Sequence, residues 1–464
     1  MSRTLISVGG TGQHVALAIA RLVYMGAIRN DVRLIAIDPD NESPLPKLLE
    51  APAGMSGDRH PLGTGQVHAP FDIARFGDAT FEQLFVDEHH PFERELFEAM
   101  FDEDMASIPV HKGMYGTPCV GATVFAEGAN GATFKTLLAP VANATQVFVC
   151  GSVVGGTGAG IMHKLVSEVR KYFQGPMYGL FMLPWFKVQA SAATQGAITD
   201  ATIQRNATHG IKYFFVHTIP ALTSSVLVGY PGNHQSAVLK PLTLGAGDMG
   251  EHPHFLHLVA AHGLTRLEEA HTANRSVKAY GVAHDEAQED WLLTNAWEEP
   301  RGRSLRQVIR AHRVLLNLLR FLVADKQKNA VQSFYGSGAV ARAVLAKSRS
   351  SWGKDLHTSI ESAEVTSSQQ GVVVEQMFRE LEQLEREVRL CVEWAERLFP
   401  EALLRLPQGD PMLDAFQKGT ADQWEAIQKV WSGKALPPKP TGKLTGAEIA
   451  RHHARAILDE ALKA

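Results

Sequence analysis

Short apolar runs alternate with helical patterns along the first half of the chain. Residues 4–8, 32–37 and 146–150 are runs of aliphatic and β-branched side chains, which are typical of buried strands. Apolar residues at helical spacing follow the first run over residues 14–25 and the third run through about Tyr172. This alternation predicts an α/β fold whose strands form a doubly wound parallel sheet.

The alternation continues beyond these units. We expect a strand over residues 177–183 that ends at Pro184, a helix over 198–209 and a further strand over 211–217. Stretches rich in Gly and Pro predict loops at residues 50–71 and 230–251. In a sheet of this kind the ligand is expected at the carboxyl ends of the strands.

The pattern changes after Pro253. Residues 254–270 have the spacing of one long helix, and residues 275–282 are typical of a strand. The other elements expected in this half are helices at residues 304–324, 373–399, 421–431 and 447–462. We therefore expect an α/β domain at residues 1–252, a long central helix at 253–273, and a second, mostly helical or α+β domain at 274–464.

Composition and charge exclude several classes of protein. Hydrophobic residues make up 45% of the 464 residues and charged residues 20%, which excludes a disordered or collagen-like chain. A net charge of −4 gives no electrostatic sign of a nucleic-acid or anionic-membrane partner. Cys119, Cys150 and Cys391 lack CxxC spacing, so neither a disulfide framework nor a zinc site is expected, and Cys150 is expected in the core. Residues 314–324 are too short to span a membrane and the first apolar stretch is too short for a signal peptide, so a cytoplasmic location is expected.

Glycines cluster where two of the expected strands end. The first cluster, Gly9-Gly10-Thr11-Gly12, is expected to form a tight loop between a strand and a helix, and a turn without ligand would explain it equally well on its own. The second cluster is Gly155-Gly156-Thr157-Gly158-Ala159-Gly160, also between a strand and a helix. No Lys-Ser/Thr pair follows it, so it is not a Walker A loop. Two glycine-rich strand–helix junctions in one sheet favour a phosphate site, with backbone N–H groups as donors.

The second cluster resembles the GGGTG(S/T)G signature of the tubulin/FtsZ family, with Val154 in place of the first glycine. The run that precedes it, Val147-Phe148-Val149-Cys150, is similar to the strand that precedes the signature in that family. Four further loops of the family have counterparts in order. They are residues 9–14, where Gln13 and His14 replace a polar residue of the family, 38–40 (Asp-Pro-Asp), 112–121, where Pro-x-x-Gly opens a helix, and 183–186, the loop that closes over the ribose. The resemblance covers about residues 3–218.

The resemblance implies a GTP/GDP site, with Mg²⁺ as the accompanying ion, in a GTPase that assembles head to tail. By this resemblance the nucleotide-binding residues are Gly10, Thr11, Gly12, Gln13, His14, Asp38, Asp40, Gly116, Thr117, Pro118, Val154, Gly155, Gly156, Thr157, Gly158 and Pro184. Acidic residues of the neighbouring subunit complete the site in this family, and Asp285 and Asp290 fall near the corresponding loop. No metal ligand is assigned directly, and the helical C-terminal half is a candidate surface for other protein partners.

The sequence also departs from the family. Residues 187–194 lack the Glu and Arg that FtsZ-type members place there, the acidic Asn-x-Asp-x-x-Asp pattern is absent, and residues 219–221 occupy the expected position of the base-reading residue. Two alternatives therefore stay open. One is a Rossmann-type dinucleotide enzyme, which Gly10-Thr11-Gly12 and Asp38 favour, although Val15 stands where the third glycine belongs. The other is a nucleotide-binding structural or regulatory protein that does not hydrolyse its ligand.

Several side chains allow both a structural and a functional interpretation. Asp38 and Asp40 are expected either to structure their own loop or to reach a phosphate-bound Mg²⁺ through water. Trp185 is expected in the core rather than stacked on a ligand. The histidine groups at residues 89–90, 252–257 and 452–453 are expected to be surface or loop residues, not metal ligands.

Overall fold

The computed structural model describes residues 3–24, 32–40, 66–67, 79–86, 91–128, 132–188, 199–229, 241–242, 255–269, 277–285, 290–295 and 303–304, with residues 379, 382, 385, 386 and 389. The chain divides into two compact units. Residues 1–20, 30–283 and 293–302 form the first unit, and residues 21–29, 284–292 and 303–464 form the second. The elements described below are those of the first unit, except that residues 21–24, 284–285, 290–292 and 303–304 belong to the second.

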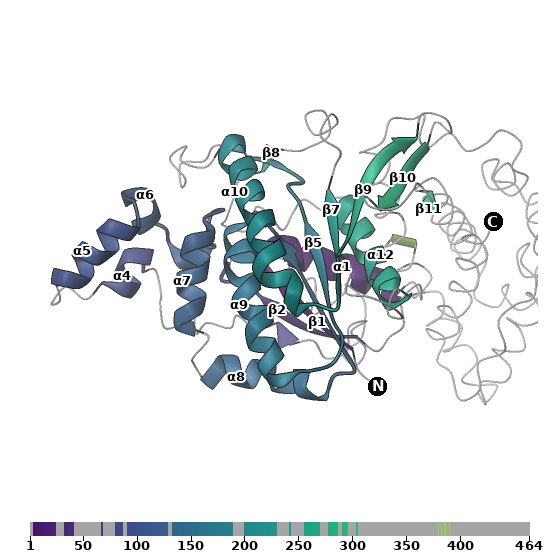
Figure 1. Ribbon diagram of the computed structural model, residues 1–464, viewed down its shortest axis with the longest axis horizontal. Helices are drawn as coiled ribbons and strands as arrows, with labels where there is room; N and C mark the ends of the chain where they lie inside the picture. Colours follow the sequence, from purple (N-terminus) through teal and green to yellow (C-terminus); the bar gives the residue numbers. More distant parts are fainter. Residues whose placement is uncertain are drawn as a thin grey trace, which may run out of the picture. The chain divides into compact units, whose positions relative to one another are not determined.

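Parallel strands form the main sheet (Figure 1). In spatial order they are β9 (Val277–Asp285), β7 (Ser224–Gly229), β5 (Met177–Met182), β4 (Gln146–Ser152), β1 (Arg3–Val8), β2 (Val32–Ile37) and β3 (Gln66–Val67). Each neighbouring pair in this series runs parallel. The expected α/β class with a parallel sheet is therefore confirmed.

The central strands are buried from end to end. Every residue of β1, β5 and β7 is buried, and so is all of β4 after Gln146. The sequence of such a strand is a continuous apolar run, because both faces of the strand are covered in a parallel sheet. This is why the runs at residues 4–8, 32–37, 146–150 and 177–183 predicted strands within two residues of the observed bounds.

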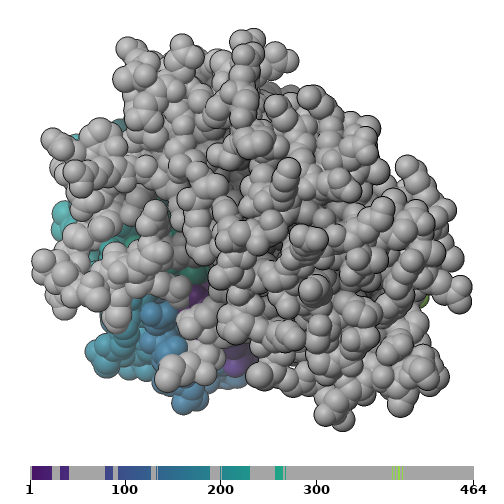
Figure 2. Space-filling model, turned by 90° about the vertical axis from the view of Figure 1, so that its right-hand side faces the viewer, coloured from purple at the N-terminus to yellow at the C-terminus, as the bar shows by residue number. Residues whose placement is uncertain are grey.

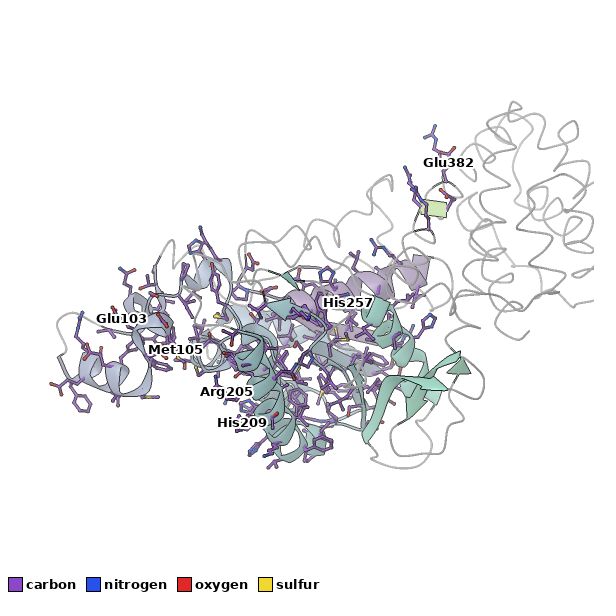
Figure 3. All side chains as sticks on the ribbon, turned by 90° about the horizontal axis from the view of Figure 1, so that it is seen from above. Glu103, Met105, Arg205, His209, His257 and Glu382 are labelled. Carbon is purple, nitrogen blue, oxygen red and sulfur yellow. The ribbon has the colours of Figure 1, made fainter. Side chains whose placement is uncertain are left out.

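Helices cover the sheet on both sides. In Figure 1, α9 (Gly156–Tyr172) and α10 (Asp200–Tyr213) lie on the near side of the sheet and α1 (Gly9–Tyr24) lies on the far side; Figure 3 shows the same order from above. The helix α12 (Phe255–Glu269) packs against β5 and β7. The expected helices at residues 14–25, 198–209 and 254–270 correspond to three of these elements.

Smaller elements complete the description. The helices are α4 (Phe81–Phe85), α5 (Pro91–Met100), α6 (Glu103–Ala106), α7 (Pro118–Gly128) and α8 (Ala132–Leu138), with 3-10 turns at Val110–Lys112, Ala139–Asn143 and Ile219–Ala221. The strands β6 (Lys187–Val188) and β8 (Pro241–Leu242) pair with each other. Two further strands follow β9 along the chain, β10 (Asp290–Asn295) and β11 (Arg303–Ser304). Atoms of the first unit reach the surface at the lower left of Figure 2, coloured blue and teal.

The prediction of a strand at residues 211–217 is wrong. The helix α10 continues to Tyr213, and a π-helical turn, Phe214–Thr218, follows it. Phe214 and Thr218 are buried while the residues between them are exposed, which is helical spacing. The aromatic and β-branched composition of this run suggested a strand, but the strand comes later, as β7. Residues 219–221 consequently form a 3-10 turn and do not follow a strand.

Three other expectations need correction. The cluster at Gly9–Gly12 is not a loop, because α1 already begins at Gly9. Two residues of the loop expected at 50–71 pair with β2 as the short strand β3, and Ser304, the expected start of a helix, ends β11. The remaining predictions for this half lie outside the described residues, apart from β8, Ser304 and five residues in the segment 373–399. They are the loop at 230–251 and the helices at 304–324, 373–399, 421–431 and 447–462. Within the described part of the chain, no helix is both long enough and apolar enough to cross a membrane.

Candidate functional site

The strand order changes direction between β1 and β4. From β1 the chain passes to β2 and β3 on one side, whereas from β4 it passes to β5, β7 and β9 on the other. These two neighbours run parallel, with Val8 beside Gly151 at their carboxyl ends. Open parallel sheets bind ligands at such a switch point, outside the carboxyl ends of the strands.

A pocket lies at this switch point. It is open to solvent and encloses about 630 Å³ of empty space, part of which is solvent. Its lining comes from six places in the sequence, namely the β1–α1 junction, the segment after β2, the segment before α7, the β4–α9 junction, the segment after β5 and α10. The lining residues are Val8, Gly9, Gly10, Thr11, Asp38, Asp40, Gly113, Met114, Tyr115, Gly116, Ser152, Gly155, Gly156, Thr157, Gly158, Phe186 and Ile203.

The structure brings most of the expected site residues into this lining. Those that line the pocket are Gly10, Thr11, Asp38, Asp40, Gly116, Gly155, Gly156, Thr157 and Gly158. The expected residues outside the lining are Gly12, Gln13, His14, Thr117, Pro118, Val154 and Pro184. Most of these lie in a layer directly behind the wall, because Gly12, Gln13, His14, Thr117, Val154 and Pro184 are buried.

Gln13 and Asp38 form part of that wall. The Gln13 side-chain Nε2 donates to Asp38 Oδ2 over 2.5 Å, and the backbone N–H of Asp40 donates to Asp38 Oδ1 over 3.2 Å. Burial raises the pKa of Asp38 to about 8; the negative charge of Asp40 adds to this, while the two hydrogen bonds oppose it. These contacts support the loop-structuring interpretation of Asp38. Both carboxyl groups nevertheless line the pocket.

Left-handed backbone conformations concentrate at the pocket. Among the described residues, positive φ angles occur at Gly9 (69°), Gly113 (103°), Tyr115 (43°) and Gly116 (75°), and all four residues line it. Tyr115 is the non-glycine member of this set, and it is buried. Such backbone conformations carry an energetic cost and tend to cluster at ligand sites.

The backbone N–H groups of the first turn of α9 lie at the pocket. Gly155 is the N-cap of α9, and no side chain caps the helix. The Ser152 hydroxyl accepts hydrogen bonds from the backbone N–H groups of Val154 and Gly155, at 3.1 and 3.2 Å, which closes the turn before the helix. The N–H groups of the first helical turn still need an acceptor from outside the helix.

Several glycines of the second cluster serve packing. A Cβ on Gly156 would lie 2.6 Å from the Met114 carbonyl oxygen, and one on Gly158 would lie 2.6 Å from the Ser152 carbonyl oxygen. A Cβ on Gly160 would overlap the Pro118 carbonyl oxygen. At Gly155 the nearest atom would be Ser152 Cβ at 3.6 Å, an ordinary contact. Gly155 is thus the glycine of this cluster whose neighbours leave space for a side chain.

Behind the first junction lies a buried aromatic cluster. Trp185 is 1% exposed, and its indole N–H donates to the hydroxyl of Thr11 over 3.2 Å. Its ring meets the rings of His14 and His257 edge to face, at 5.9 and 4.3 Å between centroids. Trp185 is therefore a core residue, as expected. The expectation that His257 is a surface or loop residue is wrong, because it is fully buried in α12.

Sequence reasoning missed some of the lining. Phe186 and Ile203 supply apolar side chains, and Ser152 supplies a hydroxyl, yet none was singled out as a site residue. Ile203 comes from α10, and no pattern in the sequence links that helix to the glycine junctions. For Ser152, its position immediately after an apolar strand and before the glycines was the available signal.

The acidic residues assigned to catalysis, Asp285 and Asp290, stay a prediction of the sequence. Asp285 ends β9 and Asp290 begins β10, and their side chains lie outside what the structure describes. In the described part of the chain no group of three or more His, Cys, Asp or Glu side chains is placed to hold a metal ion.

Comparison with known proteins identifies similar folds. No family model matches the chain, and no curated protein does. Three solved structures are similar to parts of it. A GTPγS-bound protofilament of CetZ2 from Haloferax volcanii is 18% identical with a TM-score of 0.32, over 58% of this chain and 59% of that chain. CetZ from Methanosaeta thermophila is 14% identical with a TM-score of 0.34 (62% and 64% covered), and a GTPγS-form protofilament of TubZ from Bacillus thuringiensis is 13% identical with a TM-score of 0.25 (49% and 47% covered). The chain thus spans less than two thirds of each of these proteins. CetZ and TubZ are proteins of the tubulin/FtsZ family.

Proposed function

We propose that this protein is a divergent tubulin/FtsZ-like protein that binds GTP or GDP in the pocket between β1 and β4. The observation that carries the proposal is the convergence of two strand–helix junctions, Val8–Thr11 and Ser152–Gly158, on one pocket at the switch point of a parallel sheet. A ligand with phosphate groups fits this arrangement, because two helices begin at the pocket and direct backbone N–H groups and positive dipole ends toward it.

Among the described residues that line the pocket there is no Lys or Arg. Backbone N–H donors and a cation, and not a basic side chain, would therefore balance the negative charge of the phosphates. Asp40 supplies a carboxylate at the pocket wall, and Asp38 would add a second one once a bound cation displaces its proton to solvent, which suits Mg²⁺ held jointly by carboxylates, water and phosphate oxygens. When bound, the ion would supply charge neutralisation to the phosphates. Phe186 and Ile203 offer apolar surface for the base.

The finer parts of the proposal rest on the sequence resemblance. They are the doubly wound arrangement with a long central helix, the domain limits at residues 252 and 273, a cytoplasmic location, hydrolysis of GTP, and head-to-tail assembly in which Asp285 and Asp290 act on the neighbouring subunit's nucleotide. Light scattering and pelleting with GTP against GDP test assembly. Single-turnover hydrolysis in Asp285→Ala and Asp290→Ala tests the acids; full activity in both variants would reject their assignment.

Nucleotide binding itself is tested at Gly155. This residue is an N-cap with extended backbone (φ −73°, ψ 152°) and space for a Cβ, so Asp and Asn both fit there and both are good caps. Asp adds a negative charge beside the phosphates, whereas Asn fills the same space without charge. We expect Gly155→Asp to bind GTP at least about tenfold more weakly than Gly155→Asn, at equal or higher thermal stability.

The readouts are isothermal titration calorimetry and thermal shift with GTP, ATP and NAD. A shift with GTP that is lost in Gly155→Asp supports the proposal. A shift with NAD alone would favour the Rossmann-type alternative. Unchanged GTP affinity in a folded Gly155→Asp protein would show that GTP does not bind in this pocket. Nucleotide binding without hydrolysis would favour the structural or regulatory alternative.

A further inference from the structure

An exposed apolar row runs along α5. Phe92, Leu96 and Met100 recur every four residues and are 73%, 50% and 64% exposed, so they share one side of the helix. Glu93 and Glu95 border this row on its two sides. We call these five residues the acidic stripe. Phe97 of the same helix is instead buried, against the rings of Phe81 and Phe101.

The surroundings of the acidic stripe carry further negative charge. Within residues 91–107, all of them described, the acids besides Glu93 and Glu95 are Glu98, Asp102, Glu103 and Asp104. Arg94 is the one basic residue of this segment, and its guanidinium lies 3.6 Å from the Glu82 carboxylate, which offsets its charge. A partner for this surface therefore needs apolar anchors bordered by basic side chains.

Such a surface exists on the same chain. The outer side of α10 and the π-helical turn after it presents Arg205, His209, Lys212, Tyr213 and Val216, all exposed. Tyr213 and Val216 are 42% and 65% exposed. We call these five residues the basic stripe. No Asp or Glu occurs within residues 201–221, so its charge has one sign.

The aromatic part of the basic stripe is held in place. The Tyr213 ring contacts His163 of α9 edge to face at 4.8 Å and His217 at 4.3 Å, centroid to centroid. A tyrosine fixed between two neighbours loses little freedom on binding, which suits an anchor. π-Helical turns also recur at functional sites. In Figure 3, Glu103, next to the acidic stripe, lies toward the left end of the unit, and Arg205 and His209 lie along its lower edge.

We propose that the acidic stripe of one molecule docks onto the basic stripe of a second copy. Each surface offers exposed apolar residues framed by charges of one sign, and the two signs are opposite. Pairing either stripe with itself would place like charges together, which disfavours a symmetric contact. A contact between two different surfaces is heterologous and repeats from copy to copy. None of the ten residues lines the pocket, so this contact does not depend on the proposed nucleotide.

The test is a charge swap in the full-length, nucleotide-free protein, followed by sedimentation velocity at low ionic strength. One variant carries Glu93→Lys and Glu95→Lys, and the other carries Arg205→Glu and Lys212→Glu. We expect wild type to self-associate and each variant alone to do so at least about tenfold more weakly. An equimolar mixture of the two should regain heterodimers, because the reversed acidic stripe of one matches the reversed basic stripe of the other.

Three further variants address the apolar anchors and net charge. Leu96→Ser and Val216→Ser should each weaken association without any change of charge, whereas Lys135→Glu, on α8 and outside both stripes, should leave it near the wild-type level. Far-ultraviolet circular dichroism confirms that each variant is folded. The proposal is wrong if wild type stays monomeric, if reversal has no effect, or if the mixture does not associate. Each of these results leaves the GTP-binding proposal untouched, since no nucleotide is present.

Discussion

The imidazole rings of His14 and His257 stack face to face, with their centroids 4.7 Å apart and their planes inclined by 3°. His14 belongs to α1 and His257 to α12, so the stack joins the first helix of the pocket to a helix that packs on β5 and β7. Trp185 closes the cluster and donates to Thr11 of the pocket wall. The position of Thr11 thus depends on a buried cluster assembled from three distant parts of the chain.

Removal of the His257 ring should destabilise the protein. His257→Ala deletes a fully buried ring and leaves a cavity, so we expect a loss of about 2–4 kcal/mol in the free energy of unfolding. His257→Phe keeps a ring in the same place and should cost less than His257→Ala. Urea denaturation of the three proteins measures the difference. Equal losses in both variants would show that the stack itself contributes nothing.

Glycine at position 160 should be required for packing and not for ligand binding. It does not line the pocket, and a Cβ there would overlap the Pro118 carbonyl at the start of α7. Gly160→Ala should therefore destabilise the fold by about 1–3 kcal/mol through overpacking. Gly155→Ser, at the uncapped N-cap, is the matched control and should keep or raise stability. If thermal unfolding ranked these variants in the reverse order, the assignment of packing and pocket glycines would be wrong.

The raised pKa of Asp38 should make stability depend on pH. In the unfolded chain the carboxyl titrates near 3.8 and in the folded protein near 8, so the folded state holds a proton that the unfolded state releases. Its contribution is fully present below about pH 4 and is lost as the pH rises through about 8. Asp38→Asn cannot ionise, so its stability advantage over wild type should grow across this window, by at most about 1.4 kcal/mol per pH unit.

The measurement is chemical denaturation of nucleotide-free protein at a series of pH values. Asp104→Asn, at an exposed position on α6, is the control and should leave the pH profile of wild type unchanged. Parallel profiles for wild type and Asp38→Asn between pH 4 and 8 would contradict a buried, protonated Asp38.

Chelation of divalent cations should weaken nucleotide binding. Because Asp40 lines the pocket and the described lining residues include no Lys or Arg, phosphates without a cation face uncompensated negative charge. We expect EDTA to lower the affinity for GTP in wild type, and to lower it less in Asp40→Asn, where one carboxylate is gone. Calorimetric titrations of GTP into wild type and Asp40→Asn, with and without Mg²⁺, measure the two losses of affinity. An affinity insensitive to EDTA would mean that backbone donors suffice.

The sequence was a reliable guide where a single local signal decides the structure. The buried strands β1, β2, β4 and β5 were predicted because a strand covered on both faces must be apolar throughout. The run at residues 211–217 was misassigned because aromatic and β-branched residues fit a strand and a packed helix end equally well. Only its packing, with Phe214 and Thr218 buried and the intervening residues exposed, distinguishes the two.

By itself, the sequence determined that glycines follow two buried strands, and hence that backbone at those junctions approaches other atoms closely. The tertiary structure decided what they approach. Gly156, Gly158 and Gly160 admit neighbouring backbone, whereas Gly155 borders the pocket with space to spare. It also decided that Gln13 and His14 support the wall from behind and do not line it, and that Ile203 lines it from α10. The reason is physical: spacing along the chain fixes local conformation, but which side of a junction faces solvent depends on elements that join it only when the sheet is assembled.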